Sequence, residues 1–211
     1  MEHDFWHDRW ESNRIGFHED QPNPLLVTHF PELSVPDGGR LFVPLCGKTL
    51  DIHWLLSRGY RVAGAELSEV AIQQLFENLG VEPKISDLGD LKRYSADSID
   101  IFVGDIFKLT PALLGPVDAI FDRAALVALP VKMRADYAPH LVEITGNAPQ
   151  LLITFEYDQS RLDGPPFYIP ADEVSRHYAH RYKISSLAHD NVAAGFKGLE
   201  AKERVWLLMP L

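Results

Sequence analysis

The stretch 39–68, GRLFVPLCGKTLDIHWLLSRGYRVAGAELS, constrains the fold of this chain more than any other. Its first apolar run, 41–43, is short and closed by a proline, which is typical of a buried parallel strand. Apolar side chains then recur at helical spacing over 49–58. A second apolar run covers 60–65 and ends at Glu66. The stretch therefore predicts a strand, a turn, a helix and a second parallel strand, the first unit of an α/β fold.

The turn of this unit, 44–47, is where such a fold binds a ligand. Gly47 lets the backbone approach a bound group closely. An acid at the end of the second strand can accept hydrogen bonds from ribose hydroxyls, as Glu66 would here. The three-glycine fingerprint of dinucleotide enzymes does not occur in the turn, which favours a nucleoside without a pyrophosphate, such as S-adenosylmethionine. An ordinary core unit with Glu66 as a solvated strand end fits the same residues.

The residues Gly47, Lys48 and Thr49 also match the end of a P-loop. The complete motif needs a glycine five residues before Gly47, and this chain has Phe42 there. Hydrolysis of nucleoside triphosphates is therefore disfavoured.

Length, charge and cysteine content limit the classes of protein that this chain can belong to. A chain of 211 residues fits one α/β domain, and its net charge of −10 argues against a nucleic-acid partner. No apolar run approaches the 18 residues or so of a membrane span. The single cysteine, Cys46, excludes an internal disulfide framework and indicates a reducing cytoplasm. We expect no metal site, because His3 and His7, four residues apart, have no third ligand at a recognisable spacing.

Later apolar runs extend the sheet. They cover 99–103, 117–121, 150–156, 182–188 and 204–209. The last two are predicted to form an antiparallel hairpin, while the span 81–98 is polar and irregular. We therefore expect an α/β, three-layer Rossmann-like sandwich with a seven-stranded, mostly parallel sheet and an antiparallel C-terminal edge hairpin.

Polar residues follow two of these runs, at the edge where open α/β sheets bind ligands. Asp105 comes just after 99–103 and can accept from an exocyclic amine, and Ile106 and Phe107 can hold a flat ring beside it. A turn aspartate without a ligand is the alternative. Arg123 lies just past 117–121, at the same edge.

Large aromatic residues gather near the N-terminus. Trp6 and Trp10 are four residues apart and share a helix face, with Phe5 beside them. Phe17 follows in a polar loop. Such a stripe either packs the terminus onto the core or closes over a ligand, and the residues alone leave both open.

These motifs coincide with those of a known family. They are Trp6, Trp10 and Phe17, then VPLCGKTLD, GAELSEVAI, GDIF and FDRAALVALP. Together they closely resemble the thiopurine S-methyltransferase family, bacterial branch. The resemblance is specific from Phe5 to about Pro130 and looser towards the C-terminus, so it carries no acceptor-contacting residue across from the last third.

The resemblance implies an S-adenosylmethionine-dependent enzyme, with S-adenosylhomocysteine as product. The methyl group would pass by in-line displacement to the sulfur, selenium or tellurium of a small aromatic thiol or thiopurine-like acceptor. No general base is expected, because the leaving thioether is good and the nucleophile soft, although Arg123 would polarise the acceptor. The residues implied in cofactor binding are Trp10, Leu45, Glu66, Asp105, Ile106 and Arg123. Those implied in acceptor binding are Trp6, Phe17 and Arg123.

We further expect one domain over 1–211, with 1–30 as an N-terminal helical lid segment. We also expect a monomeric cytoplasmic protein whose partner is a small thiol, thione or chalcogen acceptor. We expect neither a nucleic-acid partner nor a membrane partner. A non-catalytic nucleoside-binding or sensor protein on the same fold stays as the alternative, because fold does not fix activity.

Overall fold

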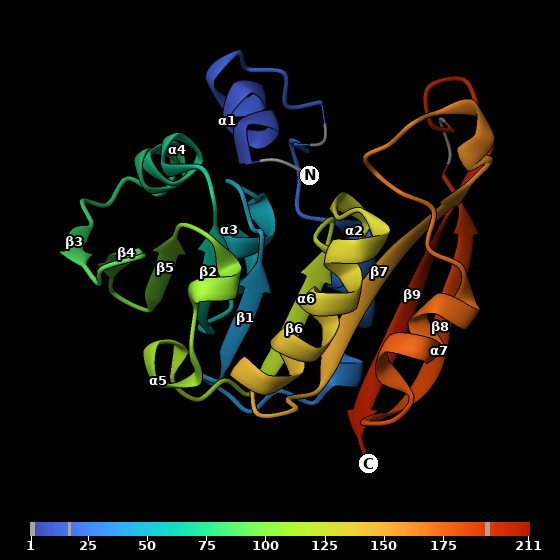
Figure 1. Cartoon of the computed structure of the whole chain (residues 1–211). Helices are drawn as coiled ribbons and strands as arrows, with labels where there is room; N and C mark the ends of the chain where they lie inside the picture. The colour runs from blue at the N-terminus through green and yellow to red at the C-terminus, as the bar shows by residue number, and fades with distance from the viewer. Residues whose placement is uncertain (1–2, 17, 193–194) are drawn as a thin grey trace.

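A nine-stranded sheet forms the middle layer of the molecule (Figure 1). The computed structural model describes residues 3–16, 18–192 and 195–211. The strand order is β3-β4-β5-β2-β1-β6-β7-β9-β8. The strands are β1 (Arg40–Pro44), β2 (Arg61–Glu66), β3 (Lys84–Asp87), β4 (Lys92–Ala96), β5 (Ile99–Val103), β6 (Ala119–Arg123), β7 (Gln150–Tyr157), β8 (Tyr182–Asn191) and β9 (Ala201–Pro210).

Five adjacent strands, β5-β2-β1-β6-β7, run parallel, and β9 and β8 follow antiparallel at one edge. This part of the sheet confirms the predicted arrangement. The predicted count of seven strands was wrong, because β3 and β4 form an antiparallel hairpin on β5 within the span read as irregular. Both strands are short and polar, β3 is the edge strand of the sheet, and in β4 only Tyr94 is fully buried. With so little apolar alternation, the period-two signal of a strand is missing there.

Helices cover both faces of the sheet. They are α1 (His3–Glu11), α2 (Pro24–His29), α3 (Leu50–Ser57), α4 (Glu69–Leu79), α5 (Pro111–Leu114), α6 (Val131–Ile144) and α7 (Ala171–Tyr178), with short 3-10 turns between them. The buried apolar residues form two clusters. One contains Tyr137 of α6 and Val174 of α7, and the other contains Leu26 of α2, Ile52 of α3 and Leu75 of α4. The three-layer sandwich is therefore confirmed.

Two helix starts bring backbone N–H groups to the carboxyl edge of the sheet. The Thr49 side chain caps α3 by accepting from the N–H of Asp51, and that of Ser68 caps α4 by accepting from the N–H of Ala71. Because α3 follows β1 and α4 follows β2, both helix starts lie beside the strand ends that the sequence singled out. Gly80, at φ 68°, ends α4 in the left-handed conformation.

Among the described residues, no helix has the length and the apolar character that a membrane span needs.

Candidate active site

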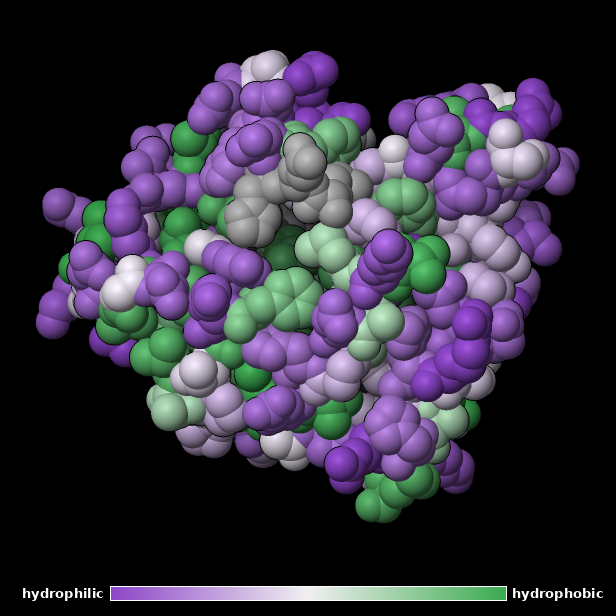
Figure 2. Space-filling view, viewed as in Figure 1, coloured by the Kyte–Doolittle hydropathy of each residue, from purple (hydrophilic) through white to green (hydrophobic). Residues whose placement is uncertain are grey.

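A cleft of about 380 Å³ runs along the carboxyl edge of the parallel strands. Its volume is that of a small-molecule site. In Figure 1, α1 and one end of the β8–β9 hairpin lie above this edge of the sheet. Figure 2 shows a hollow beneath α1 with apolar residues around it. Residues at the ends of β5, β2 and β1 line one half of the cleft: Asp105, Ile106, Glu66, Leu45 and Gly47. Residues of β6, β7, β9 and nearby loops line the other half: Arg123, Phe155, Pro165, Pro166, Phe196 and Glu203.

The turn after β1 is tightly constrained. Leu45 has φ 46° and Gly47 φ 51°, both in the left-handed region, where a side chain is strained. The N–H of Cys46 donates to the carbonyl of Ala65, which ties the turn to β2 at 3.0 Å. A Cβ atom on Gly47 would lie 2.8 Å from the Trp10 ring. Glycine at this position therefore permits the indole to pack directly on the turn.

Glu66 is buried, with 6% of its surface exposed, so it is not a solvated strand end. Its two carboxylate oxygens accept from the backbone N–H groups of Gly47, at 2.8 Å, and Ser68, at 2.9 Å. Burial raises the pKa of this carboxyl, and those two hydrogen bonds oppose the rise. Each carboxylate oxygen retains a further lone pair. Glu66 thus holds the turn and the helix start together while lining the cleft.

Asp105 and Ile106 form the far end of the same half. The Asp105 carboxylate accepts from the N–H of Phe107 at 3.0 Å and so starts a short 3-10 helix. Ile106 is buried and lines the cleft, and its carbonyl lies 2.8 Å from Nε2 of His140 on α6. The structure therefore brings Leu45, Glu66, Asp105 and Ile106 into one half, as the sequence indicated.

Arg123, the last residue of β6, lies where the other half begins. Its guanidinium forms an ion pair with the carboxylate of Glu19, and its side chain is 15% exposed. The pair joins the N-terminal segment to the sheet across 104 positions of sequence.

The N-terminal segment covers the junction of the two halves. Trp10 is 4% exposed, and Trp6 and Trp10 both line the cleft, together with His18 and Glu19. Burial lowers the pKa of His18, and the cation of Lys48 lowers it further. The sequence also pointed to Phe17, which lies outside the described residues.

The wall facing Arg123 was missed by sequence reasoning. Phe155 and Glu203 come from neighbouring strands, Pro165 and Pro166 from the loop after β7, and Phe196 from the β8–β9 connection. These segments are far apart in sequence, so no local motif marks them as a unit. The turn-rich composition of 163–167 is the one signal that could have drawn attention to this wall.

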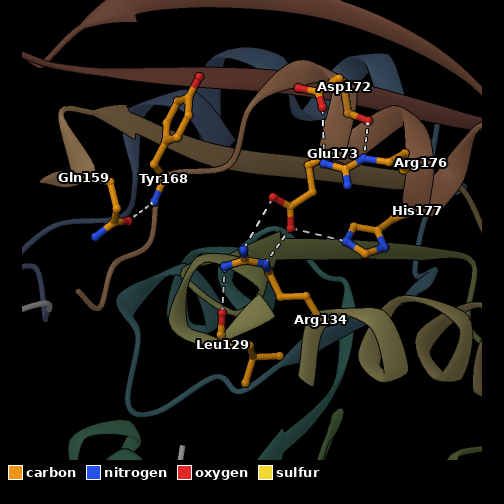
Figure 3. Close-up of polar contacts among 8 residues, drawn as sticks. All are labelled: Leu129, Arg134, Gln159, Tyr168, Asp172, Glu173, Arg176 and His177. Carbon is orange, nitrogen blue, oxygen red and sulfur yellow. Dashed lines mark hydrogen bonds and ion pairs between the residues drawn. The ribbon is translucent and has the colours of Figure 1, made fainter. Parts of the chain in front are cut away.

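A buried ion pair joins α6 to α7 near the cleft (Figure 3). Arg134 on α6 donates to the carboxylate of Glu173 on α7 at 2.6 Å and to the carbonyl of Leu129 at 2.8 Å. Nε2 of His177 lies 3.4 Å from the same carboxylate. The guanidinium of Arg134 also lies 5.7 Å from the ring centre of Phe167. Because Leu129 lines the cleft, this network fixes the loop after β6 against α7.

Solved structures identify the fold. An S-adenosylmethionine-dependent methyltransferase from Anabaena variabilis matches 98% of this chain and 94% of its own, with a TM-score of 0.63 and 14% identity. A Burkholderia thailandensis 1,6-didemethyltoxoflavin N1-methyltransferase, solved with S-adenosylhomocysteine, matches 98% of this chain and 87% of its own, with a TM-score of 0.66 and 15% identity. The fold is that of the S-adenosylmethionine-dependent methyltransferases.

Sequence relatives identify the family. The family model for thiopurine S-methyltransferase matches residues 1–208. A thiopurine S-methyltransferase of Xanthobacter autotrophicus is 58% identical over 210 residues, covering 99% of both chains. One of Teredinibacter turnerae is 53% identical over 209 residues, covering 99% of this chain and 97% of the relative. The chain belongs to the thiopurine S-methyltransferase family, whose enzymes use S-adenosylmethionine.

Proposed function

We propose that this chain transfers a methyl group from S-adenosylmethionine to the sulfur of a small aromatic thiol or thiopurine-like acceptor. A selenium or tellurium nucleophile of similar size is included. One observation carries the proposal: a single cleft joins a half with a buried acid and a glycine turn to a half lined by aromatic and proline rings. The first half suits a nucleoside, and the second suits a flat apolar acceptor.

In the first half, Glu66 would accept hydrogen bonds from the two ribose hydroxyls, using the lone pairs that Gly47 and Ser68 leave open. Asp105 and Ile106 would hold the adenine, by an accepted hydrogen bond and by contact with the ring face. Leu45 would lie against the middle of the cofactor, with Trp10 above the turn and Arg123 at its acceptor end. The residues present therefore fit S-adenosylmethionine.

In the second half, Arg123 would polarise the acceptor or favour its anionic form, with Trp6 contacting the ring from the N-terminal segment. The bound cofactor supplies an electrophilic methyl group on a sulfonium sulfur. The protein's task is then mainly to align two groups, which can lower a barrier by about 7–11 kcal/mol. For an acceptor that is already a thiolate, no general base is required.

We propose that the N-terminal segment acts as a lid within the single domain 1–211. The predicted lid segment is 1–30, and because Leu26 and Phe30 belong to the hydrophobic core, the part that would move lies before them in the chain. Trp6, Trp10 and Glu19 carry the contacts with the cleft. Closure over a bound ligand would exclude water and fix the line of methyl transfer.

We also propose that the enzyme works as a monomer in the cytoplasm, on small molecules and without nucleic acid. The net charge of −10 and the single buried cysteine support this. Size-exclusion chromatography with light scattering measures the molar mass in solution. A stable dimer would contradict the proposed monomer.

A methyl-transfer assay with labelled cofactor tests the proposed function. The panel should contain aromatic thiols, heterocyclic thiones and selenols, with aliphatic alcohols and amines as controls. We expect label in the sulfur and selenium acceptors alone. Tight cofactor binding by calorimetry, with no transfer to any member of the panel, would contradict the proposal and favour a sensor.

A further inference from the structure

We infer that Glu203 accepts the ionisable hydrogen of a heterocyclic thione acceptor and so determines which acceptors are methylated efficiently. The inference rests on the proposed function and adds a catalytic residue to it. Arg123 cannot serve in this role, because a guanidinium stays protonated in proteins.

The sheet fixes the position of Glu203. Its register partner on β7 is Phe155, and both residues line the acceptor half of the cleft. On the other side of β7, Arg123 of β6 pairs with Ile153, which also lines the cleft. A ring lying between Arg123 and Phe155 therefore has the Glu203 carboxylate at its far edge.

The carboxylate of Glu203 lacks the partners that neighbouring acids have. Within 3–16, 18–192 and 195–211, no hydrogen bond or ion pair is formed by its side chain. By contrast, Glu156 of β7 lies 3.0 Å from Arg204 and 3.3 Å from His189, and Glu19 is paired with Arg123. A half-buried acid on a strand, facing a cleft and without a partner among the residues that the structure describes, is available to a ligand.

Its electrostatic surroundings suit a proton acceptor. Burial raises the pKa of Glu203, the cation of Arg123 lowers it, and the charge of Glu19 raises it again. Asp190 is its exposed register partner on β8, and His18 lines the same cleft. A raised pKa lies closer to neutral pH, and a general base is most effective when its pKa is near the pH at which the enzyme works.

The proposed reaction transfers one methyl group and one proton. A bond forms between the acceptor sulfur and the methyl carbon, and the bond from that carbon to the sulfonium sulfur breaks, leaving its electron pair on the cofactor sulfur. The thione C=S becomes a C–S single bond. The ring N–H proton passes to the Glu203 carboxylate, and its electron pair forms the new C=N bond. The methylated product is then neutral, and Glu203 releases the proton to water.

The test compares Glu203→Gln with the parent enzyme on two acceptors. One is 6-mercaptopurine, a thione with ring N–H groups, and the other is a nitro-substituted arenethiol that is fully ionised at pH 8. For the thione, we expect kcat/KM of the variant to fall at least tenfold and the acidic limb of its pH profile to disappear. For the ionised thiol, we expect less than a threefold change. Glu203→Asp should recover part of the thione activity.

Two controls separate folding from chemistry. Glu200→Gln changes an exposed acid three positions earlier and should leave both acceptors unaffected. Calorimetry should give the same S-adenosylhomocysteine affinity for all variants, within twofold. Equal loss on both acceptors, or no loss on the thione, would overturn the inference while leaving the proposed function standing. A parent enzyme that methylates neither acceptor would overturn both.

Discussion

The two halves of the cleft are built in opposite ways. The half over β5, β2 and β1 consists of tight turns that directly follow their strands, and backbone N–H groups hold its central acid, Glu66. The half over β6, β7 and β9 is assembled from segments between Glu19 and Glu203, joined by side-chain contacts such as the Arg123–Glu19 and Arg134–Glu173 ion pairs. The first half is local in sequence, and the second is not.

This difference explains how the two halves can serve one reaction. A nucleoside cofactor is held by a turn and an acid that directly follow two strands, so a local motif supplies them with little dependence on the rest of the chain. An acceptor pocket built from loops can change one wall without disturbing the sheet. Variation in acceptor preference should therefore arise in the second half.

Two buried acids, Glu66 of β2 and Asp122 of β6, test this difference between the halves. The larger effect is expected for Asp122. This residue precedes Arg123 on β6 and is fully buried, it is hydrogen-bonded to the Tyr137 hydroxyl at 2.8 Å and the N–H of Leu126 at 3.1 Å, and burial raises its pKa from 3.8 to about 6. Since the folded pKa lies above the unfolded one, its stabilising contribution is complete below pH 3.8 and is lost as pH rises through about 6. Asp122→Asn removes this loss. The free energy of unfolding of the variant, minus that of the parent, should therefore increase by up to about 3 kcal/mol between pH 4 and pH 7.

Urea unfolding of Asp122→Asn at several pH values measures this, with the exposed Asp136→Asn on α6 as control. The affinity of the variant for the cofactor should stay within twofold of the parent, because Asp122 does not line the cleft. A stability difference that does not change with pH would contradict the assignment.

Glu66→Gln should have the next largest effect, and on binding. An amide replaces the carboxylate that would accept from two hydroxyls, and it also leaves one of two backbone N–H groups without its acceptor. Cofactor affinity should fall by roughly 1–3 kcal/mol. Calorimetry with S-adenosylhomocysteine measures it, and Glu69→Gln, whose partners Lys92 and Tyr94 lie outside the cleft, is the control. An unchanged affinity for the Glu66 variant would remove this acid from the cofactor site.

Arg123→Ala should separate turnover from folding. Because Arg123 lies at the start of the acceptor half, kcat/KM should fall at least tenfold, about 1.4 kcal/mol, while the thermal midpoint moves by no more than a few degrees. Arg176→Ala, which removes an exposed ion pair with Asp172 on α7, serves as the control. A fully active Arg123 variant, or one that unfolds, would count against a role in turnover.

Glu19→Gln should have the smallest effect, because the Glu19 side chain is 44% exposed in its ion pair with Arg123. Loss of such a pair costs at most about 1 kcal/mol of stability. If the segment is a lid, hydrogen exchange of residues 4–16 should speed up in the variant without ligand and slow down when S-adenosylhomocysteine binds. Glu32→Gln in the turn after α2 is the control. Protection that is equal with and without ligand would show a fixed packing element instead.

The sequence was informative where structure is local. The apolar runs, the turn at 44–47 and the acid Glu66 located the first half of the cleft, since each of them directly follows the preceding element in sequence. It failed at β3 and β4, whose pairing depends on the edge of β5 and not on their own polar residues. It also failed at Glu203, because only strand register places that acid beside Phe155.

A crystal structure of the enzyme with S-adenosylhomocysteine and 6-mercaptopurine tests the division of the cleft most directly. We predict the ribose hydroxyls at Glu66, the adenine beside Asp105 and Ile106, and the purine sulfur facing the homocysteine sulfur between Arg123 and Phe155. A ring N–H should point to the Glu203 carboxylate. An adenine lying over β6 and β7, or a purine held over β5 and β2, would contradict the account.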